Sequence, residues 1–414
     1  MNYRNIIVVA VLTVLTVWPS VTTGRNRIYN DNVKTLQAVV NGQWQKPAVM
    51  RLGSGDELEV SFDELSHNYH RYVCHIERCE ADWSASEGLF ESDWLEGFND
   101  LPIEDYENSL NTTVLYTHYR MALPNDRCRL KMSGNYRLHI IDEEADDEVA
   151  CVEIRVAESE AAVGLSMTTN TDIDFNQSHQ QLQMTVRLGS LRVTDVEGQL
   201  WTVVTQNGRE DTQRINMTPT AIQQDRLQWE HCRDLIFEAG NVYHKYEVLD
   251  VSHPTMGIDR IRWDGTYYQV FPFANGPRRS YTYDESANGG FLIRNSENTE
   301  VERTCDYVFV NFKMMCPEPY GNADIVVDGA WATEEPERYV MWYDGSDGSY
   351  NARILQKQGY YSYQYVVREA DGTTRLMPEE GSFFETQNRY QAYVYYKGVS
   401  DRSWRLVGFH EIGK

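Results

Sequence analysis

YRLHIIDEEADDEVACVEIRV, residues 136–156, contains two runs of alternating apolar and polar side chains joined by a short acidic stretch. A period of two places every second side chain on the same face, which is the pattern of a half-buried β-strand. The joining residues, Glu143 to Glu148, include five carboxylates in six positions. Crowded acids at a hairpin tip usually form a solvated turn, so we interpret them that way and not as a calcium site. The stretch therefore predicts an antiparallel hairpin with one face in a core.

The same alternation recurs along the chain between turn signals. Further runs are ELEVSF (57–62), QLQMTVRL (181–188) and LWTVVTQ (200–206), and Asn-Gly pairs suited to tight hairpins occur at 41–42 and 207–208. Long helical periodicity is nearly absent. These features predict an all-β chain of tandem immunoglobulin-like or E-set β-sandwich domains.

Four segments are expected from the order of these runs. They are a signal peptide at 1–24, an N-terminal β-sandwich at 25–157, a middle β-rich domain at 158–300 and a C-terminal immunoglobulin-like sandwich at 301–414. The first segment has Arg4 in its n-region, an apolar run from Ile6 to Trp18 and small or polar residues from Ser20 to Gly24. Its apolar run of about 13 residues is shorter than the roughly 20 needed to span a bilayer. We therefore expect cleavage and export.

The charge and the cysteines narrow the function classes. Lys and Arg total 38 against 62 Asp and Glu, which gives a net charge of −24. Such a field disfavours nucleic acid and anionic lipid as partners. The seven cysteines are an odd number with no C-x-x-C pair. Buried thiols are therefore favoured over a disulfide framework or a zinc site.

Motifs for catalysis or metal binding are missing or incomplete. No G-x-S-x-G elbow or H-E-x-x-H pair occurs, so we expect no enzymatic activity and no cofactor. His67 and His70 lie three apart, but spacing fixes no third metal ligand. Asp172 and Asp174 begin like a calcium loop, yet Gln177 stands where the loop needs glycine. We therefore expect no metal site.

Tyrosine is frequent, with 27 residues. Tyr361, Tyr363 and Tyr365 would share one face of a strand. A row of this kind is either packing within the sheet or a platform that stacks on a glycan or a partner peptide. The rhythm of residues 301–414 also resembles immunoglobulin-like glycogen-binding modules. Glycan binding by a periplasmic sandwich protein is therefore one function to consider, and it is the alternative to the function that the resemblance below implies.

The segment EGLFESDWLEGFNDLPIEDYENSLNTTVLYTHYRMALP, residues 87–124, carries large aromatic residues among many carboxylates. Together with IYNDNVKTLQAVVNG (28–42), RYVCHIERCEADW (71–83), SGNYRLHI (133–140) and YDESANGGFLIRN (283–295), it resembles the plug proteins of the type IX secretion system of the Bacteroidota. The matching stretches occur in order over the whole mature chain.

This resemblance implies a mechanical function. Plug proteins of this family are expected in the periplasm, at the inner side of the outer membrane. There they bind the periplasmic mouth of the translocon barrel and seal the pore when no cargo is engaged. The resemblance carries over no catalytic residue. It implies one protein partner, the outer-membrane translocon barrel, and neither nucleic acid nor direct insertion into the membrane.

A long aromatic loop is the candidate partner-binding segment, because such loops in all-β domains are often functional. Its residues are Phe90, Trp94, Leu95, Phe98 and Tyr106. The competing interpretation is that these side chains close the open end of the first sandwich. Under the docking hypothesis Trp94 and Phe98 contact the translocon, and their loss leaves the melting temperature nearly unchanged.

Overall fold

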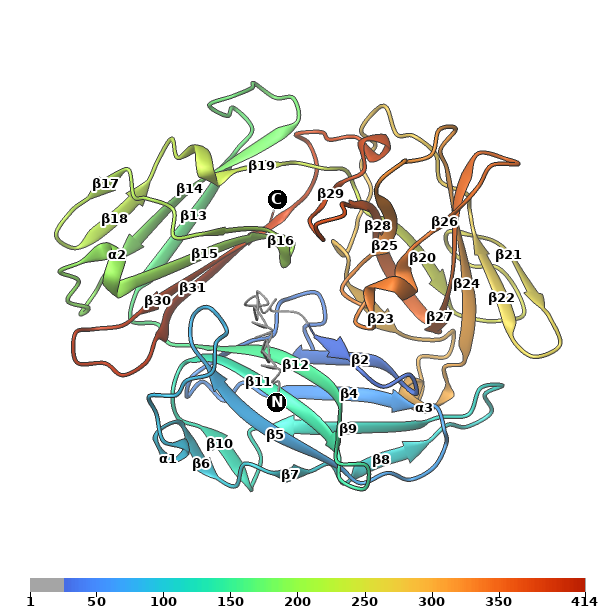
Figure 1. Cartoon of the computed structure of the whole chain (residues 1–414), viewed down its shortest axis with the longest axis horizontal. Helices are drawn as coiled ribbons and strands as arrows, with labels where there is room; N and C mark the ends of the chain where they lie inside the picture. The colour runs from blue at the N-terminus through green and yellow to red at the C-terminus, as the bar shows by residue number, and fades with distance from the viewer. Residues whose placement is uncertain (1–25, 414) are drawn as a thin grey trace, which may run out of the picture.

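The computed structural model describes residues 26–413, so the predicted signal peptide lies outside the described residues. The chain is nearly all β, which confirms the predicted fold class. Its sheets form three β-sandwiches grouped around a common centre (Figure 1). We call them the N-terminal, second and third sandwiches.

The N-terminal sandwich packs two large sheets over one hydrophobic core. The first sheet has the order β1 (Arg27–Ile28), β12 (Asp147–Ala157), β11 (Gly134–Asp142), β5 (Tyr72–Cys79) and β7 (Leu101–Pro102), with β3 (Val49–Arg51) also paired to β12. The second has the order β2 (Val33–Val40), β4 (Leu58–Glu64), β9 (Thr117–Leu123) and β8 (Asp105–Asn108). The predicted hairpin is confirmed as the antiparallel pair β11 and β12.

The second sandwich combines the middle of the chain with its C-terminal end. One sheet has the order β13 (Ala162–Thr168), β14 (His179–Arg187), β18 (Arg226–Trp229) and β17 (Ala221–Ile222), with β19 (Ile236–Glu238) beside β14. The other has the order β16 (Arg209–Ile215), β15 (Leu200–Gln206), β30 (Arg389–Tyr396) and β31 (Arg405–Gly413). In Figure 1 the red C-terminal strands accordingly lie beside the green ones.

The third sandwich is formed by the residues between these two parts. One sheet has the order β20 (His244–Val248), β28 (Gly359–Arg368) and β23 (Phe291–Ile293), with β25 (Asp324–Asp328) and β29 (Thr374–Leu376) also paired to β28. The facing sheet has the order β21 (Ile258–Trp263), β22 (Tyr268–Pro272), β24 (Tyr307–Met315), β27 (Ser349–Lys357) and β26 (Trp342–Asp344).

The remaining elements are short. A two-stranded sheet joins β6 (Leu95–Gly97) to β10 (Cys128–Leu130) at one end of the N-terminal sandwich. Single helical turns occur at α1 (Glu91–Trp94), α2 (Val196–Gln199), α3 (Val301–Thr304), η1 (Arg233–Leu235), η2 (Pro336–Tyr339) and η3 (Pro378–Glu380). No helix within residues 26–413 has both the length and the apolar character needed to cross a membrane.

The sheets do not follow the expected boundary at residue 300. β30, which was assigned to a domain at 301–414, pairs along its length with β15 of the expected middle domain. β20 and β22, expected in the middle domain, pair with β28 and β24 instead. The third sandwich is therefore inserted between two parts of the second. Periodicity identifies strands but not their distant partners, which explains the difference.

Burial of the apolar faces gives each sandwich its own core. A further apolar cluster joins the first two sandwiches, with Ala157 from β12 packed near Val203, Tyr393 and Leu406. All seven cysteines are buried free thiols, as predicted.

Candidate interaction surface and the junctions between the sandwiches

The predicted aromatic loop divides between core and surface. Trp94 and Leu95 are only 6% and 3% exposed and belong to the N-terminal core. Phe90 and Phe98 are 74% and 73% exposed. The docking hypothesis is therefore corrected for Trp94 and Leu95, whose side chains close the end of the sandwich, while Phe90 and Phe98 remain accessible.

Local geometry explains this division. The Asp93 carboxylate accepts a hydrogen bond of 2.9 Å from the backbone N–H of Phe90 and so fixes the start of α1. This turn carries Trp94 inward, where its ring lies 5.7 Å from that of Tyr136. Gly97 has φ +102°, and a Cβ there would lie 2.0 Å from the Arg127 carbonyl oxygen. Glycine therefore permits the tight turn that leaves Phe98 outside.

Tyr106 lies on β8, at the edge of the other sheet. It is 44% exposed, and its ring lies 4.8 Å from Tyr69 and 5.8 Å from Tyr119. Since Tyr119 is fully buried, Tyr106 covers the sandwich edge while leaving part of its ring accessible. Of the five predicted residues, Phe90, Phe98 and Tyr106 can therefore contact a partner.

The predicted tyrosine face is not a surface. Tyr361, Tyr363 and Tyr365 are all buried and belong to the core of the third sandwich. Their hydroxyls donate within the fold, from Tyr361 to the Lys357 carbonyl and from Tyr363 and Tyr365 to Asn275. The Tyr363 ring lies 5.0 Å from that of Phe312 on β24, so this face packs against the opposite sheet. The row cannot stack on a glycan, which removes one of the two observations behind the glycan-binding alternative; the other was the resemblance of residues 301–414 to glycogen-binding modules.

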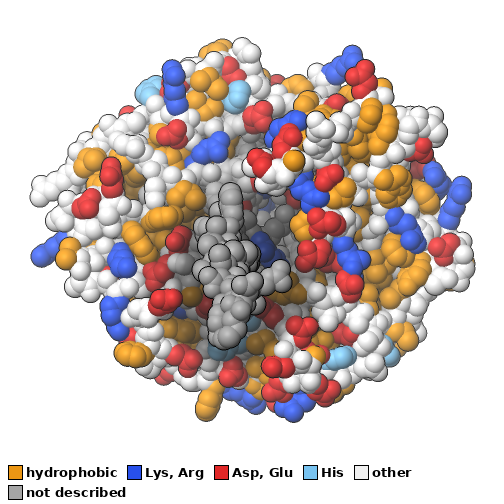
Figure 2. Space-filling model, in the orientation of Figure 1, with side chains coloured by type: hydrophobic (Ala, Val, Ile, Leu, Met, Phe, Trp, Pro, Cys, Tyr) orange, Lys and Arg blue, Asp and Glu red, His pale blue; other side chains and the backbone are white. Residues whose placement is uncertain are grey.

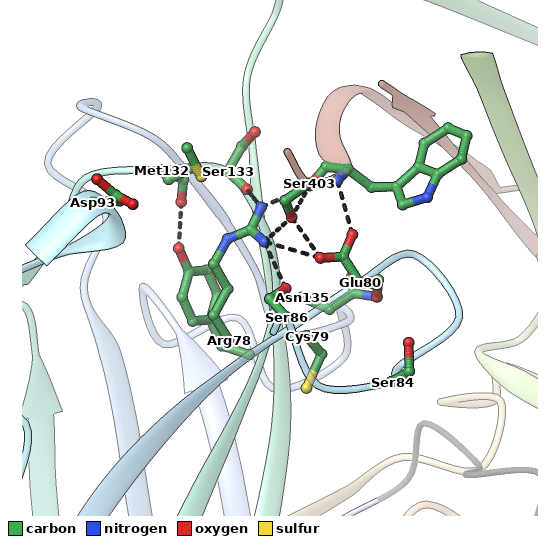
Figure 3. Close-up of polar contacts among 12 residues, drawn as sticks. Arg78, Cys79, Glu80, Ser84, Ser86, Asp93, Met132, Ser133, Asn135 and Ser403 are labelled. Carbon is green, nitrogen blue, oxygen red and sulfur yellow. Dashed lines mark hydrogen bonds and ion pairs between the residues drawn. The ribbon is translucent and has the colours of Figure 1, made fainter. Parts of the chain in front are cut away.

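A polar cluster joins the N-terminal sandwich to the second (Figure 3). Arg78 on β5 donates 2.9 Å to the Ser133 carbonyl and 2.6 Å to the Trp404 carbonyl, and it also contacts Ser403. Glu80 accepts hydrogen bonds of 2.8 Å from the Ser403 hydroxyl and 2.9 Å from the Trp404 N–H. The Arg78 side chain is buried, so these bonds are shielded from water.

A second contact at the same junction uses aromatic rings. The Arg155 guanidinium lies 4.9 Å from the ring of Trp83 and 4.4 Å from that of Tyr393. Its Nε also lies 3.3 Å from the Tyr395 hydroxyl, which donates 2.8 Å to Asn135. Cation–π contacts of this kind strengthen when they are removed from water. Both charged side chains and aromatic packing therefore hold the second sandwich against the N-terminal one.

A buried ion pair joins the N-terminal sandwich to the third. Asp63 on β4 accepts hydrogen bonds of 2.7 Å from Lys357, 2.6 Å from the Tyr307 hydroxyl and 2.7 Å from His118. Burial opposes ionisation of Asp63. However, the charge of Lys357, together with the hydrogen bond from His118, holds its pKa below the ordinary value. Asp63 is therefore a carboxylate with its charge balanced inside the protein.

Around this ion pair the chain makes further contacts between sandwiches. Asp306 accepts 2.8 Å from the Thr113 N–H and 3.0 Å from the Val114 N–H. Lys34 pairs with Glu334 at 2.5 Å where both side chains are nearly buried. Beside them is a cavity of about 30 Å³, enough for one water. These junctions were missed from the sequence because their partners lie hundreds of residues apart.

The other candidate ligands are paired within the protein. His70 contacts Asp142 at 3.0 Å, and no third metal ligand among the described residues joins it and His67. Asp172 and Asp174 contact His231 and His179, at 2.8 and 2.7 Å.

Comparison with known proteins identifies the relatives of this fold. Residues 33–158 match the family model described as the type 9 secretion system plug protein 1st domain. A crystal structure of a hypothetical protein from Parabacteroides merdae is similar with a TM-score of 0.91 and 31% sequence identity. That match covers 95% of this chain and 100% of the other. A search of curated proteins finds no match.

Proposed function

Because the chain belongs to the type IX secretion system plug protein family and takes part in type IX secretion, we propose that it is a periplasmic stopper. It binds the periplasmic mouth of the outer-membrane translocon barrel and seals the pore while no cargo is engaged. The observation that carries this proposal, beside the family, is that a buried ion pair attaches the third sandwich to the N-terminal one and a buried arginine, hydrogen-bonded to the Trp404 carbonyl, attaches the second.

A stopper must cover a wide opening without bending through it. Three sandwiches free to move about linkers would yield to a folded protein pressing on them. Here Asp63 and Arg78, both buried in the N-terminal sandwich, each bind residues of a different neighbouring sandwich. The N-terminal sandwich therefore serves as the base to which the other two are attached.

Docking is assigned to the exposed aromatic residues of the N-terminal sandwich. Phe90 and Phe98 flank the segment formed by α1 and β6 and expose most of their rings. Large aromatic side chains contribute strongly when a partner buries them at the centre of an interface. Tyr106 adds a half-exposed ring at the sheet edge. Removal of these rings from water is the proposed driving force for binding the barrel.

Charge has a lesser role in this proposal. On the face shown in Figure 2, acidic side chains alternate with basic ones over all three sandwiches. The excess of acids over the whole chain, a net charge of −24, favours solubility in the periplasm. Sealing needs no bond to be made or broken, so the proposed function requires neither catalysis nor a cofactor.

The test is affinity purification of a C-terminally tagged copy from its own host in mild detergent, followed by mass spectrometry. A very large outer-membrane barrel is expected with the wild type and is expected to be lost with the double variant Phe90→Ala/Phe98→Ala. The matched control replaces Phe175 and Phe273, which are 66% and 59% exposed and lie outside the N-terminal sandwich. Absence of any barrel from the wild-type sample contradicts the stopper. If the barrel is recovered equally with both double variants, Phe90 and Phe98 are not the docking residues, but the stopper proposal itself is not contradicted.

Sealing itself is tested by permeability. Deletion of the gene is expected to admit a large hydrophilic antibiotic that the intact outer membrane excludes, with the largest effect when no cargo is expressed. Restoring the wild-type gene, but not the Phe90→Ala/Phe98→Ala variant, returns resistance. Unchanged permeability in the deletion strain would show that the pore is closed by something else.

A further inference from the structure

The outer face of the first N-terminal sheet carries a row of metal-binding residue types across three adjacent strands. His139 on β11 lies opposite Cys151 on β12 and opposite His75 on β5. Directly opposed residues place their Cβ atoms about 5 Å apart, within reach of a shared ion. The neighbouring residues Leu138 and Ile140 face the core, so the row lies on the opposite, outward face.

A β-bulge adds a carboxylate to this row. Glu148 and Cys151 are three residues apart, so in a regular strand they would point to opposite faces. The β11–β12 register shifts between Ile140 and Ile141. With this bulge, Glu148 Oε1 lies 2.8 Å from His139 Nδ1 on the same face as Cys151. Re-aiming a side chain next to a site is a recurrent use of bulges.

The three side chains converge. One ligand atom from each of His139, Glu148 and Cys151 lies within 4.8 Å of the other two. The ring of His75 is centred 6.5 Å from that of His139, close enough to supply a fourth ligand after a side-chain rotation. His139 and Glu148 are partly exposed, which gives an ion a path from solvent.

The charges around the row favour a cation. Glu77 Oε2 lies 3.6 Å from His139 Nε2, and Glu153 follows Cys151 on the same face of β12. Arg137 opposes this, but it is already paired with Glu153 at 3.0 Å. An ion that binds there replaces the proton of the Cys151 thiol and any proton on the coordinating ring nitrogen of His139, and these protons are released to solvent.

We propose that His139, Glu148 and Cys151 bind one zinc ion, with His75 or a water as the fourth ligand. Nitrogen, oxygen and sulfur donors together suit Zn²⁺ in a tetrahedral site, whereas Ca²⁺ and Mg²⁺ require oxygen donors. The site is separate from Phe90 and Phe98, so it goes beyond the docking function. Zinc there would fasten β11 to β12 in the N-terminal sandwich, and also β5 when His75 is the fourth ligand.

Cobalt titration of the reduced, chelator-treated protein tests the proposal, because Co²⁺ occupies zinc sites and reports its ligands by absorption. One equivalent is expected to produce a thiolate-to-cobalt charge-transfer band in the near ultraviolet, which Zn²⁺ then removes. Cys151→Ser is expected to abolish the band, and His139→Gln to weaken binding by at least about tenfold. Cys232→Ser, in the second sandwich, is the matched control. It is expected to keep both the charge-transfer band and the cobalt affinity of the wild type.

The absence of a charge-transfer band in the wild type would overturn the zinc site, and so would the same band in Cys151→Ser. If that variant does not fold, Glu148→Gln decides, because its partly exposed side chain tolerates the change. It is expected to retain the band with weaker cobalt binding, and unchanged affinity rejects the site. The double variant His67→Ala/His70→Ala is expected to bind cobalt as the wild type does. A loss of cobalt binding in that variant would also reject the assignment.

Discussion

Lys357 and Asp63 form an ion pair with an Nζ–Oδ2 distance of 2.7 Å, and both side chains are almost fully removed from solvent. The two residues are 294 positions apart and belong to different sandwiches. Bringing either charge inside the protein alone is unfavourable, so the position of each is tied to that of the other. This relationship fixes the third sandwich on the N-terminal one.

Replacement of Lys357 by Met is expected to lower the free energy of unfolding by about 3–5 kcal/mol, because the buried carboxylate of Asp63 loses the cation paired with it. Urea unfolding followed by tryptophan fluorescence measures the change. The control is Lys313→Met, since the ion pair of Lys313 with Asp347 is solvent-exposed and is expected to contribute much less to stability than the buried pair. Equal effects of the two variants would show that the buried pair does not hold the junction.

The stability of the folded protein is expected to depend on pH through His139. Hydrogen bonds to Glu148 and Glu77 raise its pKa from 6.5 to about 9, although burial opposes the shift. Because the folded pKa is raised, this contribution is fully present below about pH 6.5 and is lost as the pH rises through about 9. In the presence of chelator, the stability difference between wild type and His139→Gln should shrink over that interval. If the stability difference between the two proteins is constant from about pH 6 to pH 10, the pKa of His139 is not raised in the folded protein.

Alanine substitutions at Trp94 and Phe98 are expected to affect stability very differently, although the two residues are only four positions apart. Trp94→Ala is expected to cost about 3–5 kcal/mol of stability, because it removes a buried ring from the N-terminal core. Phe98→Ala is expected to change stability by no more than about 0.5 kcal/mol, since its side chain is mostly exposed. Thermal or urea unfolding of the two purified variants measures both. A large loss from Phe98→Ala would place that ring in the core as well.

The all-β fold was predictable because each strand carries its own signal. The alternation of residues 136–156 predicted the hairpin that the structure shows as β11 and β12. Strand partners were not predictable in the same way. β15 pairs with β30 almost 190 residues later, and nothing in the local pattern of either strand identifies the other. The expected domain boundary at residue 300 failed for this reason.

The candidate site was only partly predictable. Alternation placed Tyr361, Tyr363 and Tyr365 on one face of β28, but it cannot say whether another sheet covers that face. In the aromatic loop, Trp94 and Phe98 look alike by residue type, and only the turn at α1 separates them. Glu148 and Cys151 came together through a bulge, which breaks the period on which sequence reasoning depends.

Replacement of Arg78 is expected to loosen the contact between the second sandwich and the N-terminal one. Its guanidinium binds the Ser133 and Trp404 carbonyls, and a Cβ at Gly134 would lie 2.9 Å from its Nη2. Arg78→Met removes these donors and leaves the two buried carbonyls without their arginine partner. Amide hydrogen exchange is therefore expected to speed up at Ser403 and Trp404 with little change in β24 of the third sandwich.

The neighbouring Arg402 provides the matched control for this prediction. It belongs to the same connection between β30 and β31 and reaches Asp93 of the N-terminal sandwich at 2.7 Å, but its side chain is half exposed. An exposed ion pair contributes little, so Arg402→Met should leave exchange at Trp404 nearly unchanged. If both variants accelerate exchange equally, the junction depends on the number of contacts and not on the burial of Arg78. If neither does, the apolar cluster of Val203, Tyr393 and Leu406 holds the two sandwiches together without the polar contacts.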